Sequence, residues 1–393
     1  MSRAGSQQRT LLGILGRVRP HWRSDSGLPA RIDALLGGDR RLGSRDRRLY
    51  RELVYTAVRY LPWVEPLLDS DPPGAVRRAA WLAADTPELG PFRAEVSAGL
   101  PHCPADAGEK ARILGADADA LSPAWLRGEC PGAFLPPLRE ALLSRAPLWL
   151  RLQTDDPDAV FGEFDRLGWS WRPSALIAGA VELPPGTDVG RTDAFASGKV
   201  EVQDVGSQLI LGAVGVAPGG HWLDACAGSG GKTLQLAALL GPKGRVAARD
   251  VRSSALEELS LRASRAGLAG RIQIAPGADP AGGYDAVLVD APCSGSGTWR
   301  RAPHLKWITS AEDVKKAAAL QLRLLKENAP SVRRGGLLVY ATCSLCRSEN
   351  EAVAGAFLAD DARFEPELAG RTLLPQSHNG DGFFVASFRR RQA

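Results

Sequence analysis

Two cysteines and an aspartate stand where strands of a predicted sheet end. Asp290 closes the apolar run 284–290 and is followed, three residues later, by Cys293. Cys343 lies just beyond a second apolar run, residues 336–340. Because the carboxyl ends of parallel strands converge on one crevice, we expect Asp290, Cys293 and Cys343 to lie close together. Two thiols beside a carboxyl group suit nucleophilic catalysis with acid–base assistance.

One reaction that needs such a set is methylation of a pyrimidine at C5. This carbon is a poor nucleophile toward a methyl sulfonium, but a thiolate added at C6 produces an enamine whose C5 can attack. Asp290, in a closed site, could stabilise the adduct through N3, and a base must later remove the C5 proton so that the thiol leaves. The competing interpretation is that Cys293 and Cys343 are small buried hydrophobic residues.

A glycine-rich turn after the short apolar run 221–224 predicts a ligand-binding loop in a first βα unit. Its spacing does not match G-x-G-x-x-G, and Cys226 stands where a P-loop ending in Lys232-Thr233 needs its first glycine. The glycines allow a ligand to approach the backbone, and Asp250, ending the next strand, could accept from ribose hydroxyls. The loop therefore favours S-adenosylmethionine (SAM), with an ATP-binding P-loop as the alternative.

From about residue 200 onward, strands alternate with helices, which indicates a parallel α/β sheet. We predict strands at 244–250, 271–275, 284–290, 336–340 and 383–388, and helices at 253–267, 310–328 and from a cap at 348–351 to residue 358. The stretch 284–290 is apolar enough to be buried on both faces. The fold class expected here is a doubly wound, Rossmann-like α/β domain over residues 201–393.

Residues 1–145 are predicted to form a helical domain. Its clearest helix covers 47–61, where Leu49, Leu53, Ala57 and Leu61 recur every four residues and Pro62 follows. Arginines stand off that apolar face, among them Arg47, Arg48 and Arg51. They could present positive charge to phosphate. The alternative, equally supported by the local sequence, is the solvated basic side of a bundle helix.

The sequence changes character at residue 147. Residues 148–152, 169–171 and 180–183 resemble strands and 158–167 a helix, which predicts a small α+β platform over 146–200. Trp169 or Trp171 could stack on nucleic-acid bases, although a role in the core or a linker is at least as well supported.

Composition limits the remaining possibilities. The 393 residues suggest two or three domains, and the net charge of +5 favours a polyanionic partner mildly over a merely solvated basic surface. There is no signal-peptide core and no apolar run long enough to span a membrane, so we expect a cytoplasmic, reducing setting for the six cysteines. The five histidines lack metal-ligand spacing, and we expect no metal.

Several motifs together resemble one family, the Sun/Fmu-type (RsmB/NOP) SAM-dependent RNA cytosine-C5 methyltransferases. The resemblance is strong over about residues 145–393 and weak before them. The motifs that carry it are 202–209 (VQDVGSQL), 224–233 (DACAGSGGKT), 290–297 (DAPCSGSG), Arg300-Arg301 with Lys306-Trp307, 342–344 (TCS) with 349–351 (ENE), and His378 with 381–384 (DGFF).

The resemblance implies that Cys343 is the attacking thiolate and that Cys293 assists release of the methylated base. It implies a NusB-like helical N-terminus and an enzyme that acts on RNA, with ribosomal RNA the expected substrate. We also predict that the platform is RRM-like and that the protein is a monomer. Two further alternatives stay open: a DNA-type cytosine methyltransferase in which Cys293 is the nucleophile, and a non-catalytic RNA-binding or ribosome-assembly factor. The residues expected to contact RNA are Arg47, Arg48 and Arg51, if the basic side of the helix 47–61 is functional, and Arg300, Arg301 and Lys306 of the family motifs. The implied cofactor residues are Cys226, Ala227, Gly228, Ser229, Gly230, Gly231, Lys232, Asp250, Asp279 and Asp290.

The sequence departs from the family pattern at two places. Gly228-Ser229 stand where the family has Ala-Pro, which bears on the rigidity of the loop. Ala302-Pro303-His304 stand where it has His-Pro-Asp, so any role of that acid is absent.

Overall fold

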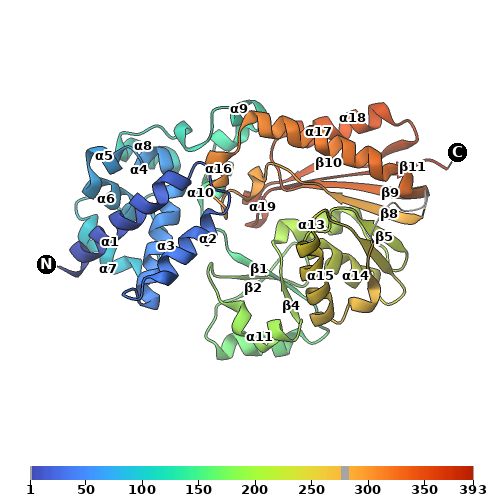
Figure 1. The fold of residues 1–393 in the computed structure, drawn as a ribbon, viewed down its shortest axis with the longest axis horizontal. Coiled ribbons are helices and arrows are strands. Elements are labelled where there is room, and N and C mark those ends of the chain that lie inside the picture. The colour runs from blue at the N-terminus through green and yellow to red at the C-terminus, as the bar shows by residue number, and fades with distance from the viewer. Residues whose placement is uncertain (1, 276–282, 393) are drawn as a thin grey trace. The chain divides into compact units, whose positions relative to one another are not determined.

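The computed structural model describes residues 2–275 and 283–392 and divides into two compact units (Figure 1). The first comprises residues 1–145 together with 299–311. The second comprises residues 146–298 and 312–393. The segment 299–311 thus belongs to the N-terminal unit although it lies in the middle of the C-terminal sequence, an arrangement that no local pattern indicated.

The first unit is built from helices. The apolar residues that recur every four positions, from which its clearest helix was predicted, are buried. Leu49, Leu53 and Ala57 of α3 enter a core that also contains Leu11 and Trp22, while the arginines of α3 lie off that face. The helices are α1 (Arg3–Val18), α2 (Leu28–Gly38), α3 (Ser44–Arg59), α4 (Leu61–Val64), α5 (Leu67–Ser70), α6 (Pro72–Leu82), α7 (Leu89–Val96), α8 (Ala107–Leu114), α9 (Leu126–Glu129), α10 (Leu138–Leu143) and α16 (Leu305–Ile308).

The second unit begins with a four-stranded antiparallel sheet in the order β2-β3-β1-β4. Its elements are β1 (Leu148–Leu152), α11 (Pro157–Arg166), β2 (Arg172–Pro173), β3 (Ala180–Leu183), α12 (Asp193–Ala196) and β4 (Val200–Val202). The prediction of a strand at 169–171 was wrong. Trp171 instead stacks on Phe161, with ring centroids 4.0 Å apart, and its indole donates to Asp165.

A seven-stranded sheet follows, in the order β10-β11-β9-β8-β5-β6-β7. Strands β5 to β9 pair in parallel, while β11 runs antiparallel between β9 and β10. The strands are β5 (His221–Asp224), β6 (Arg245–Ala248), β7 (Ile272–Ile274), β8 (Tyr284–Asp290), β9 (Val332–Thr342), β10 (Phe364–Leu373) and β11 (Phe383–Arg390). The helices are α13 (Val205–Val214), α14 (Gly231–Leu240), α15 (Ser253–Arg265), α17 (Ala311–Asn328), α18 (Glu351–Asp360) and α19 (Pro375–His378).

Helices cover both faces of this sheet, as its continuous apolar strands require (Figure 1). Leu288 of β8 packs in the cluster formed with α13, α14 and α15. The preceding residue, Val287, packs in the cluster formed with α17 and α18. The carboxyl ends of β5, β6, β8 and β9 therefore face one edge, where a doubly wound sheet binds its ligands.

Candidate active site

The two predicted thiols meet at this edge. Cys293 follows β8, Cys343 follows β9, and the parallel register places Asp290 opposite Ala341. The two Sγ atoms are 3.3 Å apart and both thiols are free. The hydrogen bond with Cys343, together with burial, raises the pKa of Cys293 well above that of an ordinary thiol. Cys293 therefore holds its proton at neutral pH and can donate a hydrogen bond to the Cys343 sulfur.

One buried carboxylate holds both thiol-bearing loops (residues 291–297 and 343–350, the thiol loops). Glu349 is 0% exposed. It accepts from the Ser294 amide at 2.7 Å, the Ser344 hydroxyl at 2.5 Å and the Gln321 amide at 3.1 Å. Ser294 follows Cys293 and Ser344 follows Cys343, so the carboxylate fixes each thiol through its neighbour.

The sequence pointed to Glu349 as part of a helix cap and of the family motif 349–351, without a role in holding the thiols. The structure places it in a 3₁₀ turn, and α18 begins two residues later, at Glu351. A glutamate beside a cap is ordinarily solvated, and nothing local marked this one as buried. The signal that could have found it is the pair of serines after the two cysteines, whose polar groups need a partner once buried.

Close backbone contact joins the thiol loops to the start of β11. The Gly297 amide donates to the Cys343 carbonyl at 3.0 Å, and the Gly382 amide donates to the Gly297 carbonyl at 2.8 Å. A Cβ atom on Gly297 would lie 2.1 Å from the Gly382 oxygen. Glycine is therefore required at position 297 by the proximity of two other main chains.

The glycine-rich turn between β5 and α14 (residues 225–231, the cofactor loop) has the close-approach geometry predicted for it. Gly228 and Gly230 have φ of 54° and 91°. A Cβ on Gly230 would lie 2.2 Å from Leu259. The Gly228 amide donates to Asp250 at 2.8 Å, which ties the loop to the end of β6.

Acidic and basic side chains surround this loop. Asp250 also accepts from Arg252, whose side chain is 66% exposed, at 3.0 Å. Lys232 forms an ion pair with Asp290 at 2.8 Å. Asp224 is buried and accepts from Thr233 at 2.8 Å, and burial raises its pKa to about 7. Carboxylates beside a glycine turn fit the ammonium, sulfonium and ribose hydroxyls of SAM.

The other two cysteines near the site are poor nucleophiles. Burial, reinforced by Asp224, raises the pKa of Cys226 to about 12. Burial also raises the pKa of Cys346 to about 12, and its sulfur lies 3.5 Å from the Ser296 hydroxyl. Since the thiolate is the reactive form, these two thiols suit a structural role.

The structure brings most of the predicted cofactor residues to one place and leaves one untested. Residues Cys226, Ala227, Gly228, Ser229, Gly230, Gly231 and Lys232 form a single turn and the start of α14, with Asp250 and Asp290 at neighbouring strand ends. Asp279 lies outside the described residues.

Two of the residues expected to contact RNA are buried in the helical unit. Arg300, 2% exposed, donates to Ser144 at 2.8 Å. Lys306, 5% exposed, donates to the Arg59 carbonyl at 3.2 Å, and burial lowers its pKa to about 7. Because both side chains are buried, they are not placed for direct contact with phosphate. Both instead hold the segment 299–311 in the helical unit. Arg301 remains exposed.

His304, at the position where the family pattern has an acid, belongs to the same anchor. Its Nε2 lies 3.1 Å from the Ser26 carbonyl oxygen. Burial lowers its pKa.

Three arginines earlier in α3 lie nearer to solvent and are paired with other groups. Arg48 pairs with Glu88 at 2.6 Å and Arg51 with Asp33 at 2.7 Å. Arg47 donates to the Gly37 carbonyl at 3.4 Å. Exposed ion pairs of this kind contribute about 0–1 kcal/mol to the free energy of unfolding. An RNA phosphate can therefore replace the carboxylates of Glu88 and Asp33 with little loss of stability.

Within residues 2–275 and 283–392, no group of three or more His, Cys, Asp or Glu side chains could hold a metal ion. Over the same residues, no helix is long and apolar enough to cross a membrane.

The fold and site define a class. A mixed seven-stranded sheet with β11 antiparallel beside β9, a glycine loop after β5 and an acid at the end of β6 make this a Rossmann-like SAM-dependent methyltransferase fold. A solved structure, PH0851, has this fold, with a TM-score of 0.76 and 21% identity over 99% of this chain and 100% of that one.

Sequence comparisons give the family. Residues 213–389 match the family described as 16S rRNA methyltransferase RsmB/F. The chain is 34% identical over 298 residues to ribosomal RNA small subunit methyltransferase B of Xylella fastidiosa, covering 71% of this chain and 70% of that one. It is 37% identical over 238 residues to the probable methyltransferase B of Bacillus subtilis, covering 55% of this chain and 53% of that relative.

The chain belongs to the RsmB/F family of 16S rRNA methyltransferases. This confirms the expected resemblance and the expected cofactor, SAM. It also decides against the P-loop ATPase alternative.

Proposed function

We propose that this protein transfers a methyl group from SAM to C5 of a cytosine in ribosomal RNA through a covalent Cys343–C6 adduct. The observation that carries the proposal is the pair of thiols 3.3 Å apart at the ends of two adjacent parallel strands. Methylation of an exocyclic nitrogen or a ribose hydroxyl needs no such pair, whereas C5 methylation needs a nucleophile at C6 and later a base.

The thiols have different roles in this proposal. A Cys293 S–H that donates to Cys343 stabilises the Cys343 thiolate before attack. Once Cys343 is bonded to C6 its negative charge is gone, and the hydrogen bond that held the proton on Cys293 is lost. With the neighbouring charge gone, Cys293 can lose its own proton to solvent and, as a thiolate, take the proton from C5. The C6–S bond then breaks, and Cys343 leaves as thiolate.

Asp290 is assigned the contact with N3 of the cytosine. It lies three residues before Cys293, and its side chain, 29% exposed, is paired with Lys232. The Lys232–Asp290 pair can supply hydrogen bonds to the base as C6 becomes tetrahedral.

SAM supplies an electrophilic methyl group when bound. Residues Cys226 to Lys232 and Asp250 are proposed to hold it, with the glycines allowing close approach and Asp250 accepting from the ribose. Calorimetric titration should give a SAM signal and none with ATP.

The remaining parts are assigned to RNA. We propose a NusB-like RNA-binding role for residues 1–145, an RRM-like platform at 146–200 and the methyltransferase domain at 201–393, in a monomeric, cytoplasmic enzyme. Arg47, Arg48, Arg51 and Arg301 are the proposed phosphate contacts. Replacing the first three with Ala should weaken RNA binding and flatten its dependence on salt, and an unchanged slope would return this face to a solvated role.

The deciding test is a denaturing gel with labelled RNA and SAM. Cys343→Ala should abolish methylation and any protein–RNA adduct, because the first bond cannot form. Cys293→Ala should accumulate adduct, because methyl transfer proceeds but elimination is slowed. The double variant should give no adduct. Adduct in Cys343→Ala but not in Cys293→Ala would reverse the roles, and normal methylation by both would exclude covalent catalysis.

A further inference from the structure

The helical unit contains a cavity of about 670 Å³ that the proposed reaction does not use. It lies among α6, α7 and the loop 97–104, with Arg59, Lys110 and Arg145 at its wall. The charged side chains that line it are four cations, these three and Arg93, and one acid, Asp85.

Two of these cations lack a carboxylate partner. Arg59 is 6% exposed; its Nη2 donates to the Arg300 carbonyl, but its Nε has no hydrogen-bond partner. Lys110 is 9% exposed and donates to the Ala105 carbonyl and the Tyr60 hydroxyl at 3.2 and 3.3 Å. Among the described residues, neither forms an ion pair within 4 Å. Glu52, the carboxylate that interacts electrostatically with Arg59, is itself paired with Arg145 at 3.2 Å. Buried charges without a direct ion pair are costly, and a bound anion would offset that cost.

We propose that this cavity binds a phosphate group, carried by an RNA strand or by a free nucleotide. An anion at Arg59 and Lys110 would satisfy the unpaired Nε and neutralise two buried charges at once. Tyr60 lines the same cavity, and its hydroxyl accepts from Lys110 at 3.3 Å, which holds the ammonium in place for an anion. The inference extends the RNA-binding part of the proposed function to a specific pocket.

The test uses an exposed lining position so that the fold is left intact. Ala98→Glu should weaken binding of a fluorescent single-stranded oligoribonucleotide about tenfold and lower the salt slope by about one, whereas Ala98→Lys should strengthen it. Ala124→Glu, exposed but outside the cavity lining, is the matched control and should change little. Arg59→Met, checked for an unchanged melting profile, should also lose affinity.

AMP and inorganic phosphate are titrated against the same variants. If the Ala98 substitutions change the affinity for AMP but not the affinity for the oligonucleotide, the pocket is assigned to a free nucleotide. Equal affinities of the Ala98→Glu and Ala98→Lys variants for all three probes would overturn the proposal. Binding is measured without SAM, so its failure is distinct from failure of the methylation chemistry.

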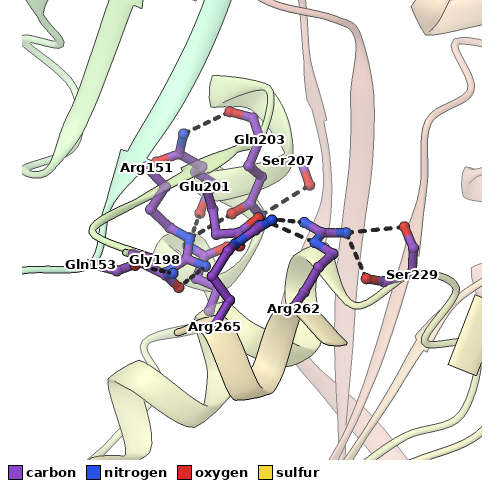
Figure 2. A network of polar contacts seen from close by, with 11 residues as sticks. Arg151, Gln153, Gly198, Glu201, Gln203, Ser207, Ser229, Arg262 and Arg265 are labelled. Carbon is purple, nitrogen blue, oxygen red and sulfur yellow. Dashed lines mark hydrogen bonds and ion pairs between the residues drawn. The ribbon is translucent and has the colours of Figure 1, made fainter. Parts of the chain in front are cut away.

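A separate observation concerns how the cofactor loop is held (Figure 2). Arg262 of α15 donates to both the carbonyl and the hydroxyl of Ser229, at 2.6 and 3.1 Å. Its other nitrogens donate to Glu201 at 2.8 and 3.2 Å. Ser229 is the residue that stands where the family pattern has a proline.

Glu201 fixes Arg262 in turn. Its side chain, 2% exposed, belongs to β4 of the smaller sheet and also pairs with Arg265 at 2.6 Å. Figure 2 shows the two arginines reaching the carboxylate side by side, with only Arg262 continuing to Ser229. The smaller sheet is thereby connected to the cofactor loop through one carboxylate and one guanidinium.

The geometry points to Arg262 as a positioning residue that supplies by hydrogen bonding the rigidity a proline ring would give this loop. A proline fixes φ and restricts the unfolded chain, whereas a serine leaves the loop free unless its groups are held. Arg262 holds two of them. This inference rests on the proposed SAM site.

Arg262→Ala and Arg265→Ala make a matched pair, since each removes one cation from Glu201 but only the first releases Ser229. We expect Arg262→Ala to raise KM for SAM about tenfold with kcat little changed, and Arg265→Ala to leave KM within twofold. Ser229→Pro in the Arg262→Ala background should restore part of the loss. Equal effects of the two arginine variants on KM would overturn the inference, while absence of SAM binding by the unaltered protein would instead overturn the proposed site.

Discussion

The thiol loops and the cofactor loop lie at the same sheet edge but are held by different forces. Neutral donors from serine and glutamine side chains and the backbone surround the single buried Glu349 in the thiol loops. Ion pairs hold the cofactor loop and its surroundings, as in Lys232–Asp290 and Arg252–Asp250, and one of those partners is largely exposed.

This difference matches what each region must do. In the proposed reaction a nucleophile has to be within bonding distance of C6 at every turnover, and a buried hydrogen-bond network around Glu349 resists displacement. A cofactor has to enter and leave, and the exposed Arg252 side chain can release Asp250 at a cost of about 1 kcal/mol or less, whereas the Lys232–Asp290 pair is largely buried. Each prediction below perturbs one of these arrangements, beginning with the largest expected effect.

Glu349→Ala should be the most damaging of these substitutions. It leaves the Ser294 amide without its acceptor, while the Ser344 and Gln321 groups keep the Ser296 hydroxyl and the Pro292 carbonyl as partners. One unsatisfied group and two weakened ones in this buried network should cost at least about 1–3 kcal/mol of the free energy of unfolding. Chemical denaturation measures this. Glu351→Ala, two residues away and exposed, is the control and should change stability by less than about 0.5 kcal/mol. Comparable effects would mean that the network does not hold the thiol loops.

Asp224 should make the stability of the methyltransferase unit depend on pH. Its pKa is raised to about 7 by burial, so the folded state binds its proton more tightly than the unfolded state does. The resulting stabilisation is complete below about pH 4 and is lost as pH rises through 7. Asp224→Asn keeps an acceptor for Thr233 and should flatten the rise in stability on acidification between pH 8 and 5, as followed by urea denaturation. An unchanged pH profile would contradict the raised pKa.

Arg252→Ala should have the smallest effect. Its guanidinium is exposed, so its pair with Asp250 should contribute less than about 0.5 kcal/mol to folding. Removing it frees an Asp250 oxygen that we assign to the ribose, so SAM affinity should stay the same or rise up to about threefold by calorimetry. A large loss of affinity would show that Arg252 itself binds the cofactor.

The sequence predicted the parts of this site that depend on strand order. Asp250, Asp290, Cys293 and Cys343 each follow a recognisable apolar strand, and parallel strands must bring those ends together. Glycines with positive φ were likewise expected in the turn after β5. These features are local in sequence, or follow from topology that local patterns determine.

What could not be predicted depends on contacts distant in the chain. Arg300 and Lys306 looked like phosphate ligands because charge is visible in a sequence, whereas the carbonyl and hydroxyl partners that bury them belong to residues more than a hundred positions earlier. The link from Glu201 to Ser229 through Arg262 also joins three separate elements. The sequence therefore shows that a segment is positively charged, but it does not show whether the folded protein leaves those side chains exposed to solvent.

The return of residues 299–311 to the N-terminal unit has a consequence for the order of synthesis. The ribosome completes residues 1–145 well before it makes α16 and the lysine and tryptophan that dock with it. Until then the Arg59 and Val58 carbonyls lack their partners, and the helical unit emerges unfinished while the smaller sheet and β5 to β8 are translated. A ribosome-bound chain ending before α16 should therefore expose the helical unit to proteases, and one extending past it should not.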